Sequence, residues 1–409
     1  MTDELKKQVR SCVEDMLKQQ EVAKYEIQID FAIDRGVNYL SDIGNVIVQC
    51  TKLNGEKANL YLIAKVSKKS EYRMILSIGE LFHREIYVYE CIFPMILRIQ
   101  REHRVKCDFQ QFPKLFASSS VDQMELLILE NITKKGFILC ERTQTLNYKQ
   151  ASMLMKTIGK LHALSFALRN QYPEFFEDML SKLFDLEYHG AMGRTTKYLI
   201  ENSFHKCFAL LNLENHRQAY NKLKHLPHVL YGILIKMVES EITNPYSVMI
   251  HGDLWMTNLM YKYNSAECPT ELCILDWQMT KISSPAIDIS QIMFVCLDKK
   301  IRNLHYDNLI NDYYNSFSMS LIELGGNPHI SLPFETLQSH LRKFSIIGLY
   351  TAMRMITLIS VPSDNTPDQS KDFIHNICKT TLDPNLFNDR MRDVLLDYVK
   401  YGYDLYTEN

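Results

Sequence analysis

The chain has 409 residues, enough for one large two-lobed unit or for two to three ordinary domains. Apolar residues make up 46% of it and charged residues 23%, as in an average soluble globular protein. The net charge of −2 gives no support for nucleic-acid binding, and no apolar run approaches the roughly 20 residues that span a membrane. Because the N-terminus is polar and charged rather than signal-like, we expect a cytoplasmic protein.

The N-terminal third of the chain predicts a small antiparallel sheet that carries one helix. Apolar residues recur at helical spacing in residues 1–24, which predicts an amphipathic N-terminal helix. The following segment is rich in residues that favour strands, with a turn-like stretch at 52–56. We expect a helix over 77–101 and strands over 46–50, 60–66, 114–118 and 125–130. This order of strands and helix suits an α+β lobe.

The rest of the chain is mostly helical in pattern. Two short strands are expected at 260–263 and 272–275, between helices over 151–169, 173–187, 191–222, 227–241 and much of 285–405. The predicted fold class is therefore α+β with two lobes, similar to a protein kinase. It consists of a helical extension over 1–24, an N-lobe over 25–131 and a helical C-lobe over 132–409. Such an arrangement favours a nucleotide bound in the cleft between the lobes.

One segment of the C-lobe carries a pattern typical of phosphoryl transfer. Asp253 follows a His-Gly pair, Asn258 comes five residues later, and Asp276 ends an apolar strand. Phosphoryl transfer needs one carboxylate that orients the attacking hydroxyl and accepts its proton, and further oxygens that hold Mg²⁺ against the phosphates. Asp253 fits the first role. Asn258 and Asp276 fit the second, because magnesium prefers hard oxygen ligands.

These residues also have a structural interpretation. Taken singly, Asp253 and Asn258 could be turn or cap residues, and Asp276 could cap a helix. A lone D-x-x-x-x-N occurs by chance, whereas H-G-D with an asparagine five residues later and a second strand-ending aspartate is specific. The combination favours the catalytic interpretation. His251 is expected to shape the loop by hydrogen bonding rather than to act as a base.

The pattern resembles the catalytic motif of the protein-kinase-like superfamily, as found in aminoglycoside phosphotransferases and choline kinases. Further motifs are Glu130-Asn131, Leu161-His162-Ala163-Leu164-Ser165, His251-Gly252-Asp253-Leu254-Trp255 and Ser284-Pro285-Ala286-Ile287-Asp288. Together they resemble the ecdysteroid kinase-like family, and the resemblance extends over residues 25–405. It implies a kinase-like fold, the use of ATP and Mg²⁺, and a steroid hydroxyl as acceptor.

The resemblance also implies a lysine and a glutamate at the ATP site. Lys65 would pair with the α- and β-phosphates, and Glu85 on the following helix would hold Lys65 by an ion pair. Glu80 and Glu90 are rivals of Glu85. The alternatives are a solvated strand lysine and a surface charge on the helix.

Two backbone segments complete the ATP site that the resemblance implies. Residues 36–42 occupy the position of the phosphate-covering loop but lack G-x-G-x-x-G, and Ser41 is the candidate phosphate contact in them. An ordinary β-turn is the alternative for this loop. Glu130 belongs to a hinge over 127–131, whose backbone would form hydrogen bonds with the edge of the adenine ring. The side chains of a hinge of this kind carry little specificity.

A small acceptor is favoured over a protein acceptor. Gly252 stands where protein kinases place an arginine that can pair with a phosphorylated activation loop. Only eight residues separate Asp276 from Pro285, which leaves little room for a long activation loop, and no A-P-E sequence follows. Asp288 is expected to brace the catalytic loop through backbone hydrogen bonds, with a plain helix cap as its alternative.

The C-lobe is rich in aromatic residues and methionine, which suits an apolar pocket for a lipophilic alcohol such as an ecdysteroid or a xenobiotic. Such residues are nevertheless more often core. Two alternatives remain: a choline- or aminoglycoside-type kinase for a cationic alcohol, and a catalytically silent pseudokinase that binds a hydrophobic ligand. The sequence does not indicate the acceptor or the oligomeric state. The aromatic and methionine candidates are Tyr313, Tyr314, Phe317, Met319, Phe344, Tyr350, Met353 and Met355.

Overall fold

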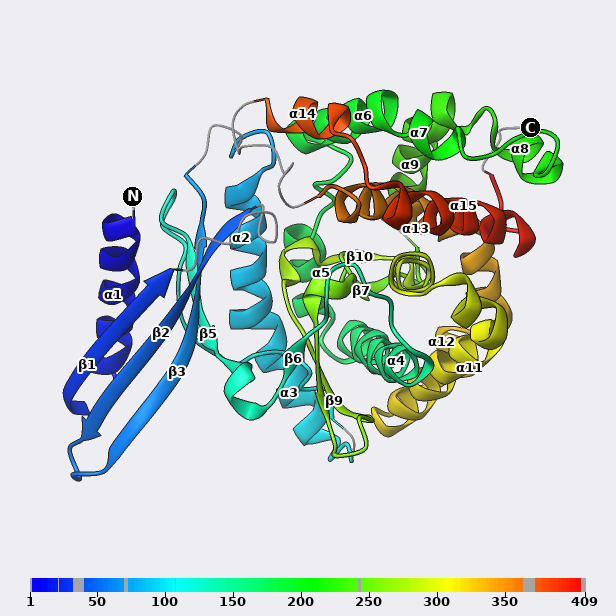
Figure 1. Ribbon diagram of the computed structural model, residues 1–409. Coiled ribbons are helices and arrows are strands. Elements are labelled where there is room, and N and C mark those ends of the chain that lie inside the picture. Colours follow the sequence, from blue (N-terminus) through cyan, green and yellow to red (C-terminus); the bar gives the residue numbers. More distant parts are fainter. Residues whose placement is uncertain are drawn as a thin grey trace.

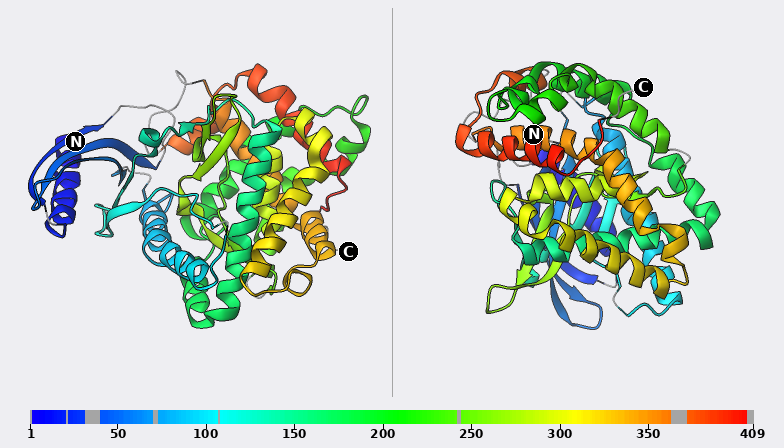
Figure 2. Two further views of the ribbon diagram at one scale, coloured as in Figure 1. Left: turned by 90° about the horizontal axis from the view of Figure 1, so that it is seen from below. Right: turned by 90° about the vertical axis from the view of Figure 1, so that its right-hand side faces the viewer.

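The fold, taken from a computed structural model, has a sheet-rich N-terminal part and a larger helical part (Figure 1). The sheet and helix α1 form one end of the molecule, and helices form the bulk of the rest, as further views show (Figure 2). This architecture confirms the predicted α+β class. The structure describes residues 2–20, 22–31, 40–69, 73–106, 108–241, 244–362 and 372–405.

Five antiparallel strands form the N-terminal sheet, in the order β1-β2-β3-β5-β4. Side chains of β5 alternate between its two faces, so that Leu126 and Ile128 pack on one side and Leu127 and Leu129 on the other. The sheet is therefore buried on both faces at this strand. The strands are β1 (Val22–Phe31), β2 (Ser41–Lys52), β3 (Lys57–Ser67), β4 (Leu115–Ser119) and β5 (Leu126–Glu130).

Helices cover both faces of this sheet. Helix α1 (Thr2–Lys18) packs its apolar stripe on one face, together with Ile128 and Val48 of the sheet. Helices α2 (Ile78–Tyr87) and α3 (Phe93–Glu102) lie on the other side and are joined by a π-helical turn. The helix predicted over 77–101 is thus confirmed, with one widened turn inside it. The buried stripe of α1 consists of Leu5, Val9, Val13, Met16 and Leu17.

Three long helices dominate the helical part: α4 (Tyr148–Gln171), α11 (Lys299–Glu323) and α13 (Phe334–Ile359). Helix α4 packs against α11, and α13 packs against the short α10 (Pro285–Gln291). Within the described ranges, no helix combines the length and apolar character needed to cross a membrane. The remaining helices are α5 (Pro173–Lys182), α6 (Gly190–Ser203), α7 (His205–Phe208), α8 (Arg217–Leu223), α9 (Leu226–Glu241), α12 (Pro328–Ser331), α14 (Phe373–Lys379) and α15 (Pro384–Lys400).

Two small antiparallel sheets lie within the helical part and hold the motif residues. Strand β7 (Val248–Ile250) pairs with β10 (Lys281–Ser283). The predicted catalytic loop, residues 251–258, follows β7 directly and is called the catalytic loop below. Strands β8 (Leu259–Tyr263) and β9 (Pro269–Ile274) confirm the two strands predicted there, and β6 (Ile138–Leu139) is added at the edge.

Some predicted boundaries are wrong. The N-terminal helix ends at Lys18 instead of continuing to residue 24, because Val22 already begins strand β1. The helix predicted over 173–187 ends at Lys182, and the one predicted over 191–222 is divided into α6, α7 and α8. The residues that follow Lys182 turn away from helical geometry, and one of them, Glu187, contributes its side chain to the cavity described below.

Candidate active site

The catalytic loop begins after β7 and is fixed by Asp288 in the first turn of α10. The backbone N–H groups of His251 and Gly252 donate to the two carboxylate oxygens of Asp288, over 2.8 and 2.9 Å. Burial alone would raise the pKa of Asp288. The hydrogen bond and charge of His162 and the hydrogen bond from Gly252 outweigh the effect of burial, so this pKa lies below its ordinary value. Asp288 therefore occupies the bracing position that the sequence indicated.

Gly252 has a backbone conformation that explains why no larger residue stands there. Its φ of +80° lies in the left-handed region, and an added Cβ would come 2.6 Å from the carbonyl oxygen of Met279. Glycine alone tolerates both constraints without strain. An arginine of the protein-kinase type is excluded by this backbone as well as by the sequence.

The ring of His251 joins the catalytic loop to the segment that carries Asp276. Its Nδ1 accepts the backbone N–H of Asp253 over 3.2 Å, and its Nε2 lies 2.9 Å from the carbonyl oxygen of Leu275. These partners assign the proton to Nε2, and burial lowers the pKa of His251, so the ring is neutral. Both contacts are to the backbone, which fits a shaping role.

Asp253 and Asn258 face each other across the loop. The Asn258 side-chain nitrogen donates to the backbone oxygen of Asp253 over 2.8 Å and to its Oδ2 over 3.2 Å. The amide oxygen of Asn258 is therefore the atom of this side chain that can bind a cation. Burial raises the pKa of Asp253 to about 6; the Arg354 charge opposes this rise, and the Asp276 and Glu187 charges add to it.

Asp276 follows β9 in a left-handed conformation, with φ of 65°. Its Oδ1 lies 2.5 Å from Lys65 Nζ, and its Oδ2 accepts from the Gln278 side chain over 3.1 Å. Non-glycine residues in this region of backbone space are strained, and such strain concentrates at functional sites. The surrounding contacts hold the carboxylate in the same cavity as Asp253.

Lys65 meets both Asp276 and Glu85. Because Ala64 packs toward α1, strand alternation turns Lys65 toward α2, where its Nζ lies 2.5 Å from Glu85 Oε2. Burial lowers the pKa of Lys65, but the two carboxylates outweigh it and raise this pKa above its ordinary value. Of the three glutamates considered, Glu85 makes the ion pair, whereas Glu80 is exposed and Glu90 accepts from the Ser118 hydroxyl.

The positions of Asn258 and Asp276 fit a magnesium site. Leu275 donates its N–H to the backbone oxygen of Asn258 over 2.8 Å, so the two metal candidates lie on adjoining backbone segments. An amide oxygen and a carboxylate are the hard ligands that Mg²⁺ prefers, with waters and phosphate oxygens completing the shell. Among the residues that the structure describes, no three His, Cys, Asp or Glu side chains cluster to hold a metal ion by themselves.

The two remaining predicted site residues are placed differently. Ser41 begins β2 and lines the same cavity as Asp253 and Asp276. The carboxylate of Glu130 does not reach that cavity: it pairs with Lys135 at 2.7 Å and faces a separate hollow. Any contribution of Glu130 to the site would come from its backbone. Residues 36–39 of the predicted phosphate-covering loop lie outside the described residues.

The cavity has a volume of about 210 Å³ and lies between the two parts of the molecule. Leu40, Ser41 and Leu76 contribute from the N-terminal part, and the other lining residues come from the helical part. Its wall along α6, α13 and α14 is mainly apolar. The apolar residues of this wall are Met192, Leu199, Phe204, Met355, Leu358, Phe373, Ile374 and Ile377, and the polar residues Thr195, Thr196, Ser203, Arg354 and Thr357 lie among them.

Only two of the eight aromatic and methionine candidates for the acceptor pocket line this cavity, namely Tyr350 and Met355. Tyr313 and Phe317 pack in the core between α4 and α11, and Met319 is 70% exposed. The core interpretation therefore holds for most of this set.

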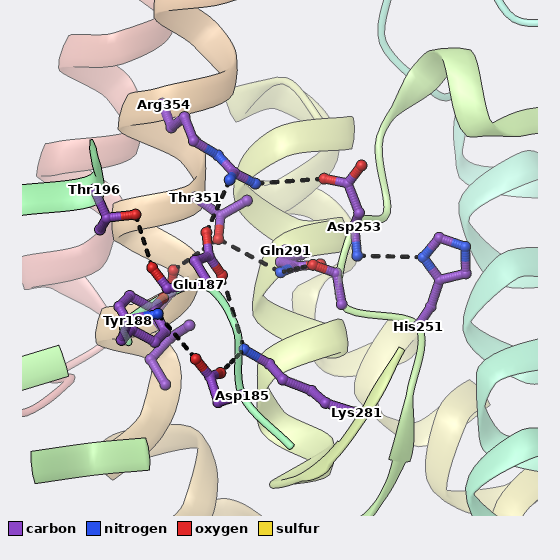
Figure 3. Close-up of polar contacts among 12 residues, drawn as sticks. Asp185, Glu187, Tyr188, Thr196, His251, Asp253, Lys281, Gln291, Thr351 and Arg354 are labelled. Atoms are coloured by element: carbon purple, nitrogen blue, oxygen red, sulfur yellow. Dashed lines mark hydrogen bonds and ion pairs between the residues drawn. The ribbon is translucent and has the colours of Figure 1, made fainter. Parts of the chain in front are cut away.

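Two charged residues of the cavity were not found from the sequence. They are Arg354 on α13 and Glu187, and Figure 3 shows Arg354 between Glu187 and Asp253. Arg354 lies 2.8 Å from Glu187 (Nη1 to Oε1) and 3.4 Å from Asp253 (Nη2 to Oδ1). Sequence spacing does not relate Glu187, Asp253 and Arg354, because they lie far apart in the chain. One feature of the sequence could have pointed to Arg354: it is the single charged residue within the otherwise uncharged stretch 344–359.

The fold and the grouped side chains define a two-lobed protein of the kinase-like class. The chain belongs to the ecdysteroid kinase-like family, whose model matches residues 35–326. This membership confirms the resemblance seen in the sequence and favours a small-molecule kinase.

A similar solved structure is described as "Structure of the microcompartment-associated aminopropanol kinase". The likeness covers 96% of this chain and 98% of that one, at 11% identity and a TM-score of 0.47, and supports no conclusion on substrate. No curated protein sequence matches the chain at a significant level.

Proposed function

We propose that the protein is an ATP-dependent kinase that transfers the γ-phosphate to a hydroxyl group of a lipophilic alcohol, an ecdysteroid or a xenobiotic. The main observation in support of the proposal is that Asp253 and Asp276 line the same cavity, whose wall along α6, α13 and α14 is mainly apolar. In this proposal residues 25–131 bind the nucleotide, and residues 132–409 supply the catalytic loop and the acceptor space.

The nucleotide side of the site would be formed by Lys65, Asn258 and Asp276. Lys65 is held by Glu85 and points its ammonium group toward Asp276, where it can pair with the α- and β-phosphates. Ser41 lies at the rim of the same cavity and can donate its hydroxyl to a phosphate oxygen. Bound Mg²⁺ would neutralise phosphate charge during transfer, held by the Asp276 carboxylate and the Asn258 amide oxygen.

Asp253 would act on the acceptor. Its carboxylate orients the acceptor hydroxyl and takes up the hydroxyl proton as the oxygen–phosphorus bond forms and the bond to ADP breaks. A carboxylate with a pKa of about 6 is a stronger base than an ordinary aspartate and is still largely ionised at neutral pH. Transfer then leaves the phosphate ester of the alcohol and ADP as products.

The cavity wall favours a lipophilic acceptor. Each Å² of apolar acceptor surface removed from water contributes roughly 25 cal/mol to binding. A steroid-like skeleton can bury a large apolar surface against α6, α13 and α14 and so gain binding free energy, whereas a choline-sized cation offers much less apolar surface.

The cationic-acceptor alternative lacks a free carboxylate in the described cavity. Three carboxylates line it, and each has a positively charged partner: Asp276 faces Lys65, and Asp253 and Glu187 share Arg354. A quaternary or protonated amine would have to compete with these partners. The pseudokinase alternative is disfavoured because the lysine, both aspartates and the asparagine are present together.

An acceptor panel tests the proposal. Phosphorylation of an ecdysteroid, a simple phenol, choline and an aminoglycoside would be measured at equal Mg·ATP concentration, with Asp253→Asn as the inactive control. We expect kcat/KM to rise with acceptor hydrophobicity and to need no positive charge. Preference for choline or the aminoglycoside would replace the proposal by the cationic alternative. Binding of Mg·ATP without product from any acceptor would favour the pseudokinase.

A further inference from the structure

We propose that Arg354 is a positioning residue that fixes the orientation of the Asp253 carboxylate, and that Glu187 and Lys281 in turn fix Arg354. The inference rests on the acceptor-side role proposed for Asp253. Figure 3 shows these side chains converging from α13, the segment after α5, β10 and the catalytic loop.

The Asp253 carboxylate has two side-chain donors, on opposite oxygens. Asn258 Nδ2 lies 3.2 Å from Oδ2, and Arg354 Nη2 lies 3.4 Å from Oδ1. The first donor belongs to the catalytic loop itself, and the second comes from a different element, 101 residues further along the chain. Within the part of the chain that the structure describes, removal of Arg354 would leave Asn258 as the remaining side-chain donor, and the carboxylate could turn about this local contact.

Arg354 is itself held on its other side by Glu187. Nη1 donates to Glu187 Oε1 over 2.8 Å, and the Glu187 side chain is only 5% exposed. The backbone oxygen of Glu187 accepts the hydroxyl of Thr196 over 2.9 Å, which ties this segment to α6. The guanidinium group thus bridges two carboxylates with its two terminal nitrogens, and a lysine cannot reproduce this fork.

Lys281 and Asp185 extend the arrangement. Lys281 Nζ lies 2.5 Å from Asp185 Oδ2 and 3.8 Å from Glu187 Oε2, and Asp185 also accepts the backbone N–H of Tyr188 over 2.9 Å. The Lys281, Asp185 and Glu187 side chains are all at most 7% exposed. A buried charge of this kind is stable only with its partner in place. Lys281 therefore restricts the position of Glu187, and Glu187 restricts that of Arg354.

The orientation of Asp253 matters because the acceptor hydroxyl must be aimed at the γ-phosphorus. Misplacement of a catalytic group by about 1 Å can lower a rate about a hundredfold. Arg354 also lines the cavity, so α13 would set both the shape of the acceptor space and the direction of the catalytic carboxylate.

The test compares Arg354→Lys and Arg354→Met with the matched variant Arg302→Lys. Arg302 on α11 forms a buried ion pair with Asp397 on α15 at 2.7 Å, and neither residue lines the cavity. We expect kcat to fall about tenfold in Arg354→Lys and about a hundredfold in Arg354→Met, with the KM for ATP unchanged within about twofold. Arg302→Lys should keep the wild-type kcat. Glu187→Gln, which weakens the support of Arg354, should lower kcat without changing the KM for ATP.

Crystal structures of the wild type and of Arg354→Met provide a readout that does not depend on turnover. We expect the Asp253 carboxylate on Arg354 in the wild type and turned to another rotamer in the variant. An unmoved Asp253, a wild-type kcat in Arg354→Lys, or a change confined to the KM of the acceptor would overturn the proposal. Lack of activity in the wild type would instead refute the proposed function, and the rotamer of Asp253 would still decide the positioning role.

Discussion

Asp253 and Asp276 are carboxylates of the same cavity, but each faces a different cation. Asp253 faces Arg354 of the helical part, and Asp276 faces Lys65 of the N-terminal sheet. The two aspartates are therefore held by cationic side chains from different parts of the molecule. This separation is consistent with one acting on the acceptor and the other on the nucleotide.

Replacement of Asp253 by asparagine should separate these two roles. Asp253→Asn keeps the size of the side chain but removes the proton-accepting charge, so we expect kcat to fall by at least about a hundredfold. ATP affinity should change little, because in the proposed function Asp253 contacts the acceptor and not the nucleotide. Steady-state kinetics with the best acceptor and calorimetry of ATP binding measure the two effects. Near-normal turnover in this variant would contradict the role assigned to Asp253.

The residues of the site differ in how far the sequence predicts their positions. Asp253 and Asn258 lie five residues apart, so local geometry alone brings them together. Lys65 and Glu85 were placed by the family resemblance, and the structure brings them into contact. Arg354 could not be placed in this way, because its contact depends on how α13 packs against the rest of the helical part.

At the scale of elements, long regular patterns were predicted well and short or interrupted ones were not. Helix α4 was expected because its apolar residues recur over many turns, and it is only slightly longer than predicted. Strand β1 was missed although Tyr25, Ile27, Ile29 and Phe31 alternate with polar residues, since the preceding helical pattern was extended too far. Strands of three residues such as β7 owe their existence to pairing partners distant in the chain.

Helices α10 and α13 pack against each other, and each contributes residues that contact the catalytic loop. Helix α10 contributes Asp288 and also Gln291, which donates to the Gly252 oxygen over 3.0 Å and accepts the Leu254 N–H over 3.2 Å. Helix α13 contributes Arg354. The two helices approach each other closely at Gly348, since an added Cβ would come 2.5 Å from Ser290 Cβ and 2.9 Å from its backbone carbon.

Gly348→Ala should therefore destabilise the protein although alanine favours helices. We expect the free energy of unfolding to fall by about 1–3 kcal/mol, the usual effect of overfilling a packed contact. The matched control is Gly232→Ala in α9, where an added Cβ meets no atom within 4 Å. That variant should be stabilised by roughly 0.5–1 kcal/mol. Urea denaturation of both variants measures the difference, and equal stabilities would show that the α10–α13 contact can relax.

At the scale of the whole molecule, buried polar contacts join the sheet part to the helical part. Lys65 of β3 contacts Asp276 at 2.5 Å, and Glu85 of α2 accepts the backbone N–H of Trp277 over 3.2 Å. Both contacts meet the segment directly after β9. A nucleotide and magnesium bound at this segment would be held by both parts and should stabilise them together.

Mg·ATP should therefore raise the unfolding free energy of the whole molecule, by about 2.7 kcal/mol at a concentration of one hundred times Kd. ATP with EDTA should stabilise much less. Asp276→Ala should abolish the magnesium-dependent part, because its carboxylate is the main protein charge on the ion, whereas Asn258→Ala removes only a neutral ligand and should reduce it less. Thermal unfolding and calorimetric titration across Mg²⁺ concentrations measure these differences. A magnesium dependence that survives in Asp276→Ala would rule out Asp276 as the metal ligand, and the metal would then have to be held elsewhere in the cavity.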